Sequence, residues 1–273
     1  MRRLRFLFGI VAFLPLAGAC FPSLDGFSDG SPTADGGGKE ATVVSSVDAA
    51  IDAAAESRPC PSNDPNVFLC EDFETAAPPD FGWTLPVVNG LLAIEPGLGR
   101  RGSRALHARQ DGKDMTSYDT SSGIERLIDT TLPIGRTITV SFWFKILATT
   151  NLEAVSLAEI NNGGGWGVQL SLFKSLDCPG GDSCLSWGNY YQPGEVPYAT
   201  AARPRLGEWQ QAEVSVTTTQ TERRGSLRID GTLVREAPLE TGTGDQNANL
   251  VIGALYGKRM TDVLIDDVIA RRQ

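Results

Sequence analysis

Paired carboxylates are the groups that would let this chain cleave a glycosidic bond, one acting as acid and the other as base or nucleophile. Glu208 and Glu213 are near neighbours in the sequence, but five positions separate them. A regular strand would therefore direct their side chains to opposite faces. The sequence predicts no catalytic pair here, and we assign no catalytic residue elsewhere in the chain.

Two segments combine aromatic rings with amides, a mixture that suits sugars because rings stack on pyranoses and amides satisfy hydroxyl groups. Residues 161–166 read Asn-Asn-Gly-Gly-Gly-Trp, and residues 187–192 read Trp-Gly-Asn-Tyr-Tyr-Gln. The predicted ligand-binding residues are Asn162, Trp166, Trp187, Asn189, Tyr190 and Tyr191. The alternative is a hairpin turn in which Trp166 and the two tyrosines pack against a sheet.

The chain has a single histidine, His107, within the sequence Leu-His-Ala. If Leu106 and Ala108 face the core of a sheet, strand alternation directs His107 outward. We therefore favour a solvated strand histidine over a general base at this position.

The N-terminus is typical of an export signal. Residues 1–19 combine a basic head, an apolar core and small residues before Cys20, and they are too short for a stable transmembrane helix. A cysteine after small residues is typical of lipidation, although Ala17 stands where leucine is usual; ordinary signal cleavage is the alternative. Residues 20–58, rich in Gly, Ser, Asp and Ala, predict a flexible linker, which leaves 59–273 as the folded part.

Five cysteines agree with export. If Cys20 carries the lipid, the other four form two predicted disulfides between sequence neighbours, Cys60–Cys70 and Cys178–Cys184, although four cysteines allow three connectivities. Such bonds persist in an oxidising compartment. Zinc is disfavoured because neither pair has finger spacing. By analogy with other lipoproteins, the residue after Cys20, which is not aspartate, favours the outer membrane of a Gram-negative cell.

The acidic composition limits the choice of partners. The net charge is −9, and removing the three signal arginines leaves about −12. An acidic chain without a basic stripe is a poor binder of nucleic acid or of anionic lipid surfaces. The predicted partners are therefore a glycan or an extracellular protein, and the membrane is contacted only through the lipid.

From about residue 59 the chain consists of short runs that alternate between apolar and polar residues. The clearest is 137–146, where period two persists throughout. Asp230-Gly231 is a tight hairpin signal between two further runs. The other predicted strands are 104–109, 154–160, 167–172, 208–217, 226–229, 232–236, 249–253 and 263–270. No window predicts an amphipathic helix, so the fold class is all-β, a sandwich or barrel.

The order of these segments resembles the laminin-G-like branch of the concanavalin A-like jelly rolls. A tryptophan opens a strand at 207–216, an Asp-Gly hairpin follows at 227–234, and an Ile-Asp-Asp-Val strand closes the domain at 264–269. Residues 70–74 resemble the first strand, so the likeness spans about residues 66–271. The resemblance implies a jelly-roll sandwich of two antiparallel sheets, a fold that hosts lectins, enzymes and passive modules.

Enzymes of this superfamily offer two patterns for comparison. Its hydrolases carry Glu-x-Asp-x-x-Glu on one strand, and residues 71–74, Glu-Asp-Phe-Glu, do not match that spacing. Residues 188–190 faintly resemble the Gly-x-Tyr strand of its polysaccharide lyases, but the accompanying lysine and a Gln-x-His run are missing. We expect a non-catalytic, carbohydrate-binding or structural module and keep a polysaccharide lyase or other glycan-active enzyme as the alternative.

The resemblance also implies one structural calcium ion where the first and last strands lie side by side, since carboxylate and carbonyl oxygens suit that ion. The matching ligands are Asp72 or Glu74 and Asp266. On a regular strand Asp266 and Asp267 point to opposite faces, so both cannot serve one ion. The alternative is a set of solvated or turn-capping acids on an edge strand.

Overall fold

The computed structural model of this chain shows strands joined by turns and irregular segments. It describes residues 60, 64–74, 83, 87–88, 90–111, 121–128, 134–149, 155–161, 167–174, 178, 183–189, 198–239, 248–255 and 260–273. These residues belong to one compact unit, Ala55–Gln273. Within this part of the chain there is no helix, and so none that could cross a membrane. The all-β prediction is confirmed, while Cys20 and the predicted signal and linker lie outside the described residues.

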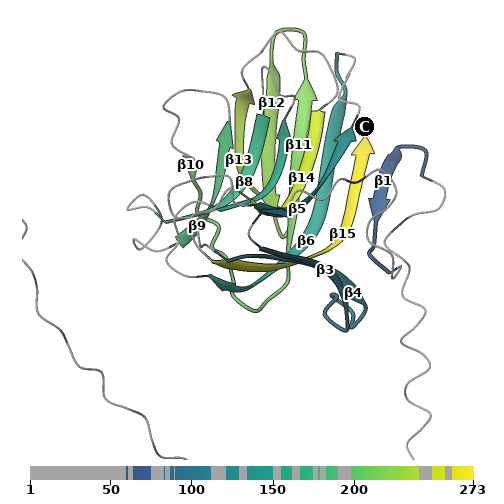
Figure 1. Cartoon of the computed structure of the whole chain (residues 1–273). Helices are drawn as coiled ribbons and strands as arrows, with labels where there is room; N and C mark the ends of the chain where they lie inside the picture. Colours follow the sequence, from purple (N-terminus) through teal and green to yellow (C-terminus); the bar gives the residue numbers. More distant parts are fainter. Residues whose placement is uncertain are drawn as a thin grey trace, which may run out of the picture. The chain divides into compact units, whose positions relative to one another are not determined.

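Sheet A has eight strands, each antiparallel to its neighbours (Figure 1). Its order is β13 (Thr232–Leu239), β12 (Arg223–Ile229), β11 (Gln210–Thr218), β6 (Thr137–Thr149), β15 (Thr261–Arg272), β4 (Arg104–Gln110) and β3 (Gly90–Pro96), with β1 (Val67–Glu71) also paired to β15. β4 pairs with residues 261–265 of β15 and β1 pairs with residues 268–271, so β4 and β1 follow one another along one edge of β15. The first and last strands therefore lie side by side, as the resemblance implies.

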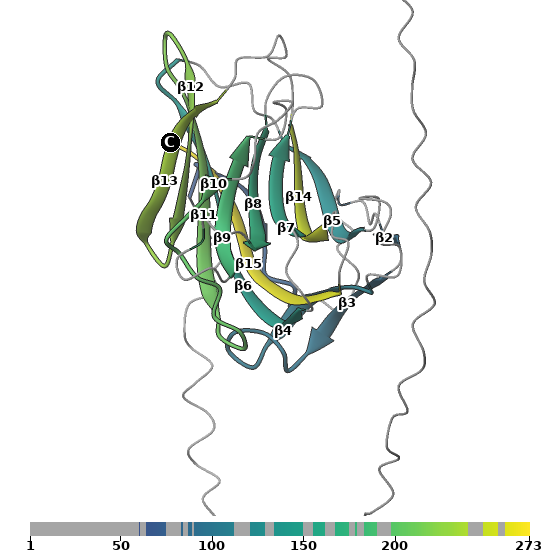
Figure 2. The same cartoon turned by 90° about the vertical axis from the view of Figure 1, so that its left-hand side faces the viewer.

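Sheet B has seven strands, also antiparallel (Figure 2). Its order is β10 (Tyr198–Ala199), β9 (Ser183–Asn189), β8 (Gly167–Lys174), β7 (Val155–Asn161), β14 (Ala248–Leu255), β5 (Ser121–Ile128) and β2 (Val87–Val88). Five of these strands, from β9 to β5, form the broad middle of the sheet. Their register decides which side chains share a face.

Strand alternation gives each sheet one face that packs against the other. The strand predicted at 137–146 is confirmed as β6, which extends to Thr149. Its core residues are Ile138, Val140, Phe142, Phe144 and Ile146, and sheet B contributes among others Ile160, Leu170, Leu172, Leu250 and Ile252. Burying each such side chain stabilises the fold by about 1.5–3 kcal/mol. The core of the sandwich is therefore apolar, and polar chemistry is confined to the outer faces and edges.

The β12–β13 hairpin turns at Asp230-Gly231, as the sequence predicts. The φ angles are 50° at Asp230 and 76° at Gly231, the left-handed pair that matches the twist of a two-residue hairpin. The Asp230 carboxylate accepts hydrogen bonds from the backbone N–H of Gln211 (2.9 Å) and from the guanidinium of Arg205 (2.8 Å). This side chain thereby ties the turn to β11.

Candidate functional site

The outer face of sheet B carries three polar side chains in a row that crosses five strands. Residues that pair directly across a sheet lie on the same face. Such pairs join Gly188 to Gln169, Gln169 to Glu159, Glu159 to Val251, and Val251 to Glu125. Their sequence neighbours, such as Leu250, Ile160 and Val168, belong to the core between the sheets. The row Gln169, Glu159 and Glu125 therefore faces away from the core.

A second row on this face consists of serines. Ser186 pairs with Ser171, and Ser171 with Ser156. Their exposed fractions are 0%, 2% and 1%, and Glu159 in the first row is only 2% exposed. Enclosing hydroxyls and a carboxylate costs free energy unless they find polar partners. We call these two rows the polar face of sheet B. Its serines and Glu159 are shielded from bulk solvent.

Sequence reasoning did not find Glu159 and Glu125 because they lie on strands that are distant in the chain. Only β14, which pairs with β7 on one side and with β5 on the other, brings them to one face. A search for carboxylates spaced along a single strand cannot detect such a pair. The sequence carried one signal for Glu159. Alternation along the predicted strand 154–160 places its side chain on the face of the sheet opposite to that of Ile160.

The prediction that Trp187 binds a ligand is wrong. Trp187 is 1% exposed and belongs to the core, because it shares the inward parity of Leu185 on β9. Its indole lies against Gly225 of sheet A, where an added Cβ would come within 2.5 Å of the ring. Asn189 lies in β9, but its side chain is not among the described ones. The other predicted ligand residues, Asn162, Trp166, Tyr190 and Tyr191, lie outside the described residues.

His107 is not solvated, contrary to the prediction. Leu106 and Ala108 do face the core, but His107 is only 8% exposed on the opposite face. Its Nδ1 lies 2.9 Å from a Glu95 carboxylate oxygen on β3, and its Nε2 lies 2.6 Å from one of Asp262 on β15. Burial by itself lowers the pKa of His107, but the hydrogen bonds to the two carboxylates outweigh it, so that the pKa is raised. His107 thus links three strands of sheet A.

We expect His107→Gln to destabilise the chain more at pH 5.5 than at pH 9. A histidine with a raised folded pKa contributes stability that is complete below its unfolded value of about 6.5 and is lost as the pH rises through the folded value. Urea denaturation of both proteins at the two pH values measures this difference. An effect of His107→Gln that is equal at both values would contradict the ion-paired histidine.

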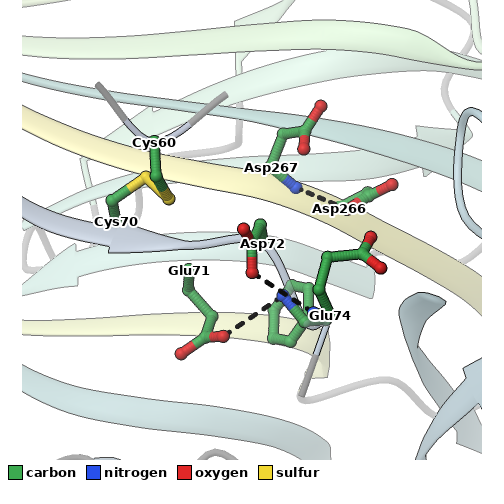
Figure 3. The surroundings of a disulfide bond; sticks show 8 residues. Cys60, Cys70, Glu71, Asp72, Glu74, Asp266 and Asp267 are labelled. Atoms are coloured by element: carbon green, nitrogen blue, oxygen red, sulfur yellow. Dashed lines mark hydrogen bonds between the residues drawn. A yellow bond between two sulfur atoms is a disulfide. The ribbon is translucent and has the colours of Figure 1, made fainter. Parts of the chain in front are cut away.

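The predicted calcium ligands meet at a bulge of β15. The register of β15 against β6 shifts after Asp266. Asp267, the next residue, has a φ of 53°. Ile265 and Val268 both face the core. The strict alternation expected here is therefore wrong, because an extra residue separates these two core positions. Figure 3 shows Asp72, Glu74, Asp266 and Asp267 around this point.

Asp266 is held by backbone donors. The side chain is 2% exposed; its Oδ2 accepts a hydrogen bond from the N–H of Arg100 (2.9 Å), and its Oδ1 accepts one from the N–H of Asp267 (2.8 Å). Burial raises the pKa of Asp266 to about 7, although these two hydrogen bonds favour the ionised form. Asp266 therefore stabilises the bulge and links it by a hydrogen bond to the segment before β4.

Within the described residues, Asp72 and Glu74 do not join Asp266 in a group of three ligating side chains. Asp72 Oδ1 accepts a hydrogen bond from the N–H of Glu74 (3.2 Å), which caps the end of β1. Across the part of the chain that the structure describes, no three acidic, histidine or cysteine side chains are grouped so that they could hold a metal ion. The residues present here thus do not fit a calcium ion held by three side chains.

Both predicted disulfides are confirmed. Cys60 is bonded to Cys70, and Cys178 to Cys184, each with Cα atoms 5.6 Å apart. The first bond joins the segment before β1 to that strand, close to the bulge of β15 (Figure 3). The second closes a short loop before β9.

Comparison with known proteins agrees with this architecture. A laminin-G family model, described as the concanavalin A-like lectin/glucanases superfamily, matches residues 119–270, more than half of the chain. No curated protein matches. Among solved structures, cellulose induced protein Cip1 is 12% identical with a TM-score of 0.52, and the match covers 74% of this chain and 96% of Cip1.

Two further structures show weaker likeness. Domain 4 of AbnA, an extracellular arabinanase from Geobacillus stearothermophilus solved with arabinotriose, is 16% identical over 76% of this chain and 92% of its own, with a TM-score of 0.45. Winged bean acidic lectin, solved with methyl-α-D-galactose, is 10% identical over 75% and 99%, with a TM-score of 0.43. Two packed antiparallel sheets and the match of the family model lead to one conclusion: the chain belongs to the concanavalin A-like lectin/glucanase superfamily.

Proposed function

We propose that this chain is a non-catalytic glycan-binding module whose ligand lies on the polar face of sheet B. The superfamily includes lectins and glucanases, so membership alone does not separate binding from cleavage. The observation that supports binding is the row formed by Gln169, Glu159 and Glu125, which faces away from the core.

The groups on this face suit the hydroxyls of a sugar. The amide of Gln169 both donates and accepts hydrogen bonds, and the carboxylates of Glu159 and Glu125 accept them. Ser156, Ser171 and Glu159 are almost fully buried, so the ligand meets this face at Gln169 and Glu125, which are partly exposed. Few, well-placed polar groups of this kind fix the orientation of a ligand and give specificity.

A glycan-active enzyme is the second candidate, and the two glutamates favour it. Glu159 and Glu125 are separated by one strand, so their Cα atoms lie about 10 Å apart. Inverting glycosidases place their carboxyl groups about 6.5–9.5 Å apart, a separation that two glutamate side chains on strands spaced in this way can reach. A lyase is less well supported, because no arginine or lysine to neutralise a uronate occurs among the described residues of the polar face.

A glycan array with the purified full chain, followed by product analysis, tests the proposal. We expect retention of at least one glycan, and no new reducing ends or unsaturated uronates after prolonged incubation with it. Release of product that stops in Glu159→Gln would establish the enzyme instead. Failure to retain any glycan on a broad array would contradict the binding module.

The proposal includes a lipid anchor at Cys20 and a tether over residues 20–58. Small residues before this cysteine and two disulfides, which persist in oxidising compartments, support export. We expect the chain made in a Gram-negative host to begin at Cys20, to carry acyl chains by mass spectrometry and to fractionate with the outer membrane. Cys20→Ser should remove the acyl chains and the fractionation with the outer membrane; a mature chain without acyl groups would contradict the anchor.

A further inference from the structure

Four carboxylates gather where β1 ends beside the bulge of β15: Asp72, Glu74, Asp266 and Asp267 (Figure 3). Asp72 and Glu74 bring like charges to Asp267, while Arg100 and Arg101 bring opposite ones. A half-buried group of like charges needs a positive charge close by if it is not to destabilise the fold.

The guanidinium of Arg100 is placed among these acids. Its Nε lies 3.6 Å from Asp267 Oδ2, and the Arg100 side chain is 21% exposed. Its Cζ lies 4.1 Å from the centre of the Trp143 ring on β6, a cation–π contact. The backbone N–H of the same residue donates to Asp266 Oδ2. Arg100 thus contacts both acids of the bulge and the central strand of sheet A.

The loop that presents Arg100 is shaped by its own backbone. Gly97 and Gly102 adopt left-handed φ angles of 77° and 75°. The N–H of Gly99 donates to the Ser103 carbonyl (3.1 Å), and the N–H of Gly102 donates to the Gly99 carbonyl (3.0 Å). This turn fixes the position of Arg100 before β4 begins, so the guanidinium is pre-organised for the bulge.

We propose that Arg100 supplies the positive charge at this junction, so that β1 and β15 are joined without a divalent cation. Both oxygens of Asp266 already accept backbone hydrogen bonds, and Asp267 faces the guanidinium. Among the described residues, no three ligating side chains are grouped for a metal. The calcium ion implied by the resemblance is the competing explanation, and the experiments below separate the two.

Thermal unfolding of the full chain in EDTA and in millimolar calcium gives the first test. We expect midpoints that agree within about 1 °C, because a ligand that binds only the folded state raises the midpoint with its concentration and no such ligand acts here. A rise of several degrees in calcium, reversed by EDTA, would overturn the proposal.

A double-mutant cycle between Arg100 and Asp267 gives the second test. We expect Arg100→Gln to lower the unfolding midpoint by roughly 5 °C. Arg136 is an exposed arginine just before β6, and Arg136→Gln should change the midpoint by less than about 1 °C. When Asp267→Asn is already present, Arg100→Gln should lower the unfolding midpoint clearly less than it does in the unmodified chain. The reason is that the acid neutralised by Arg100 is then absent. Equal losses in both backgrounds would overturn the proposal. If Arg100→Gln does not fold, the calcium measurement on the unmodified chain still decides.

Discussion

Replacing Trp187 with alanine should lower the free energy of unfolding by about 3–5 kcal/mol, because the change leaves a large cavity in the core. The indole is 1% exposed and packs between the two sheets. Urea denaturation followed by circular dichroism measures the loss. A tryptophan that served a ligand on the surface would give the reverse result, with little change in stability and a large change in binding.

Gly225 provides the matched control for Trp187. A Cβ at this position would meet Cζ2 of the indole at 2.5 Å, so Gly225→Ala should cost about 1–3 kcal/mol when Trp187 is present. The same change should cost less in the Trp187→Ala background, where the cavity admits a methyl group. Equal costs in both backgrounds would contradict the packing of Trp187 against β12.

Removing the disulfide of β1, by Cys60→Ser together with Cys70→Ser, should lower the free energy of unfolding by about 3 kcal/mol. The bond joins residues 10 positions apart, and a closed loop of that size restricts the unfolded chain by roughly this amount. Denaturation of both proteins, with and without reducing agent, measures the effect. In reductant the unmodified chain should lose the stability that both disulfides contribute. The double variant keeps only Cys178–Cys184, so its free energy of unfolding should fall by less.

An unchanged stability of this double variant would show that the segment before β1 is not anchored to the fold by its disulfide. It would also weaken the argument from cysteine chemistry for an oxidising compartment. The second bond, Cys178–Cys184, closes a loop of only 6 positions and serves as a comparison, since the loop-closure model assigns it a slightly smaller contribution.

Much of the fold could be predicted from the sequence, because alternating side chains report directly on a sheet with one buried face. The run that became β6 and the Asp-Gly hairpin are both local signals, and both were located correctly. Among the longer strands β3, β5 and β9 were missed, as were the two-residue strands β2 and β10. β3, Gly-Leu-Leu-Ala-Ile-Glu-Pro, is partly buried along almost its whole length and therefore lacks a clean alternation.

The candidate site could be predicted much less well, since it depends on how distant strands are aligned. The alternation of side chains shows which residues share a face with Trp187. It does not show whether that face is the one buried between the sheets. The bulge after Asp266 adds a residue that no alternation rule foresees. His107 was expected in solvent because the carboxylates beside it come from β3 and β15, which are separated from it by 12 and 155 positions.

The most direct test of the glycan-binding face compares two glutamines in a calorimetric titration with a glycan that the array identifies. Gln169 lies on the polar face of sheet B, and Gln211 lies on β11 of sheet A, where it pairs with Trp143; both are half-buried. Losing one or two hydrogen bonds to the ligand should weaken binding about tenfold in Gln169→Ala. Gln211→Ala should bind like the unmodified chain. Unchanged affinity in Gln169→Ala, with a loss in Gln211→Ala, would place the ligand on the other sheet and contradict the account.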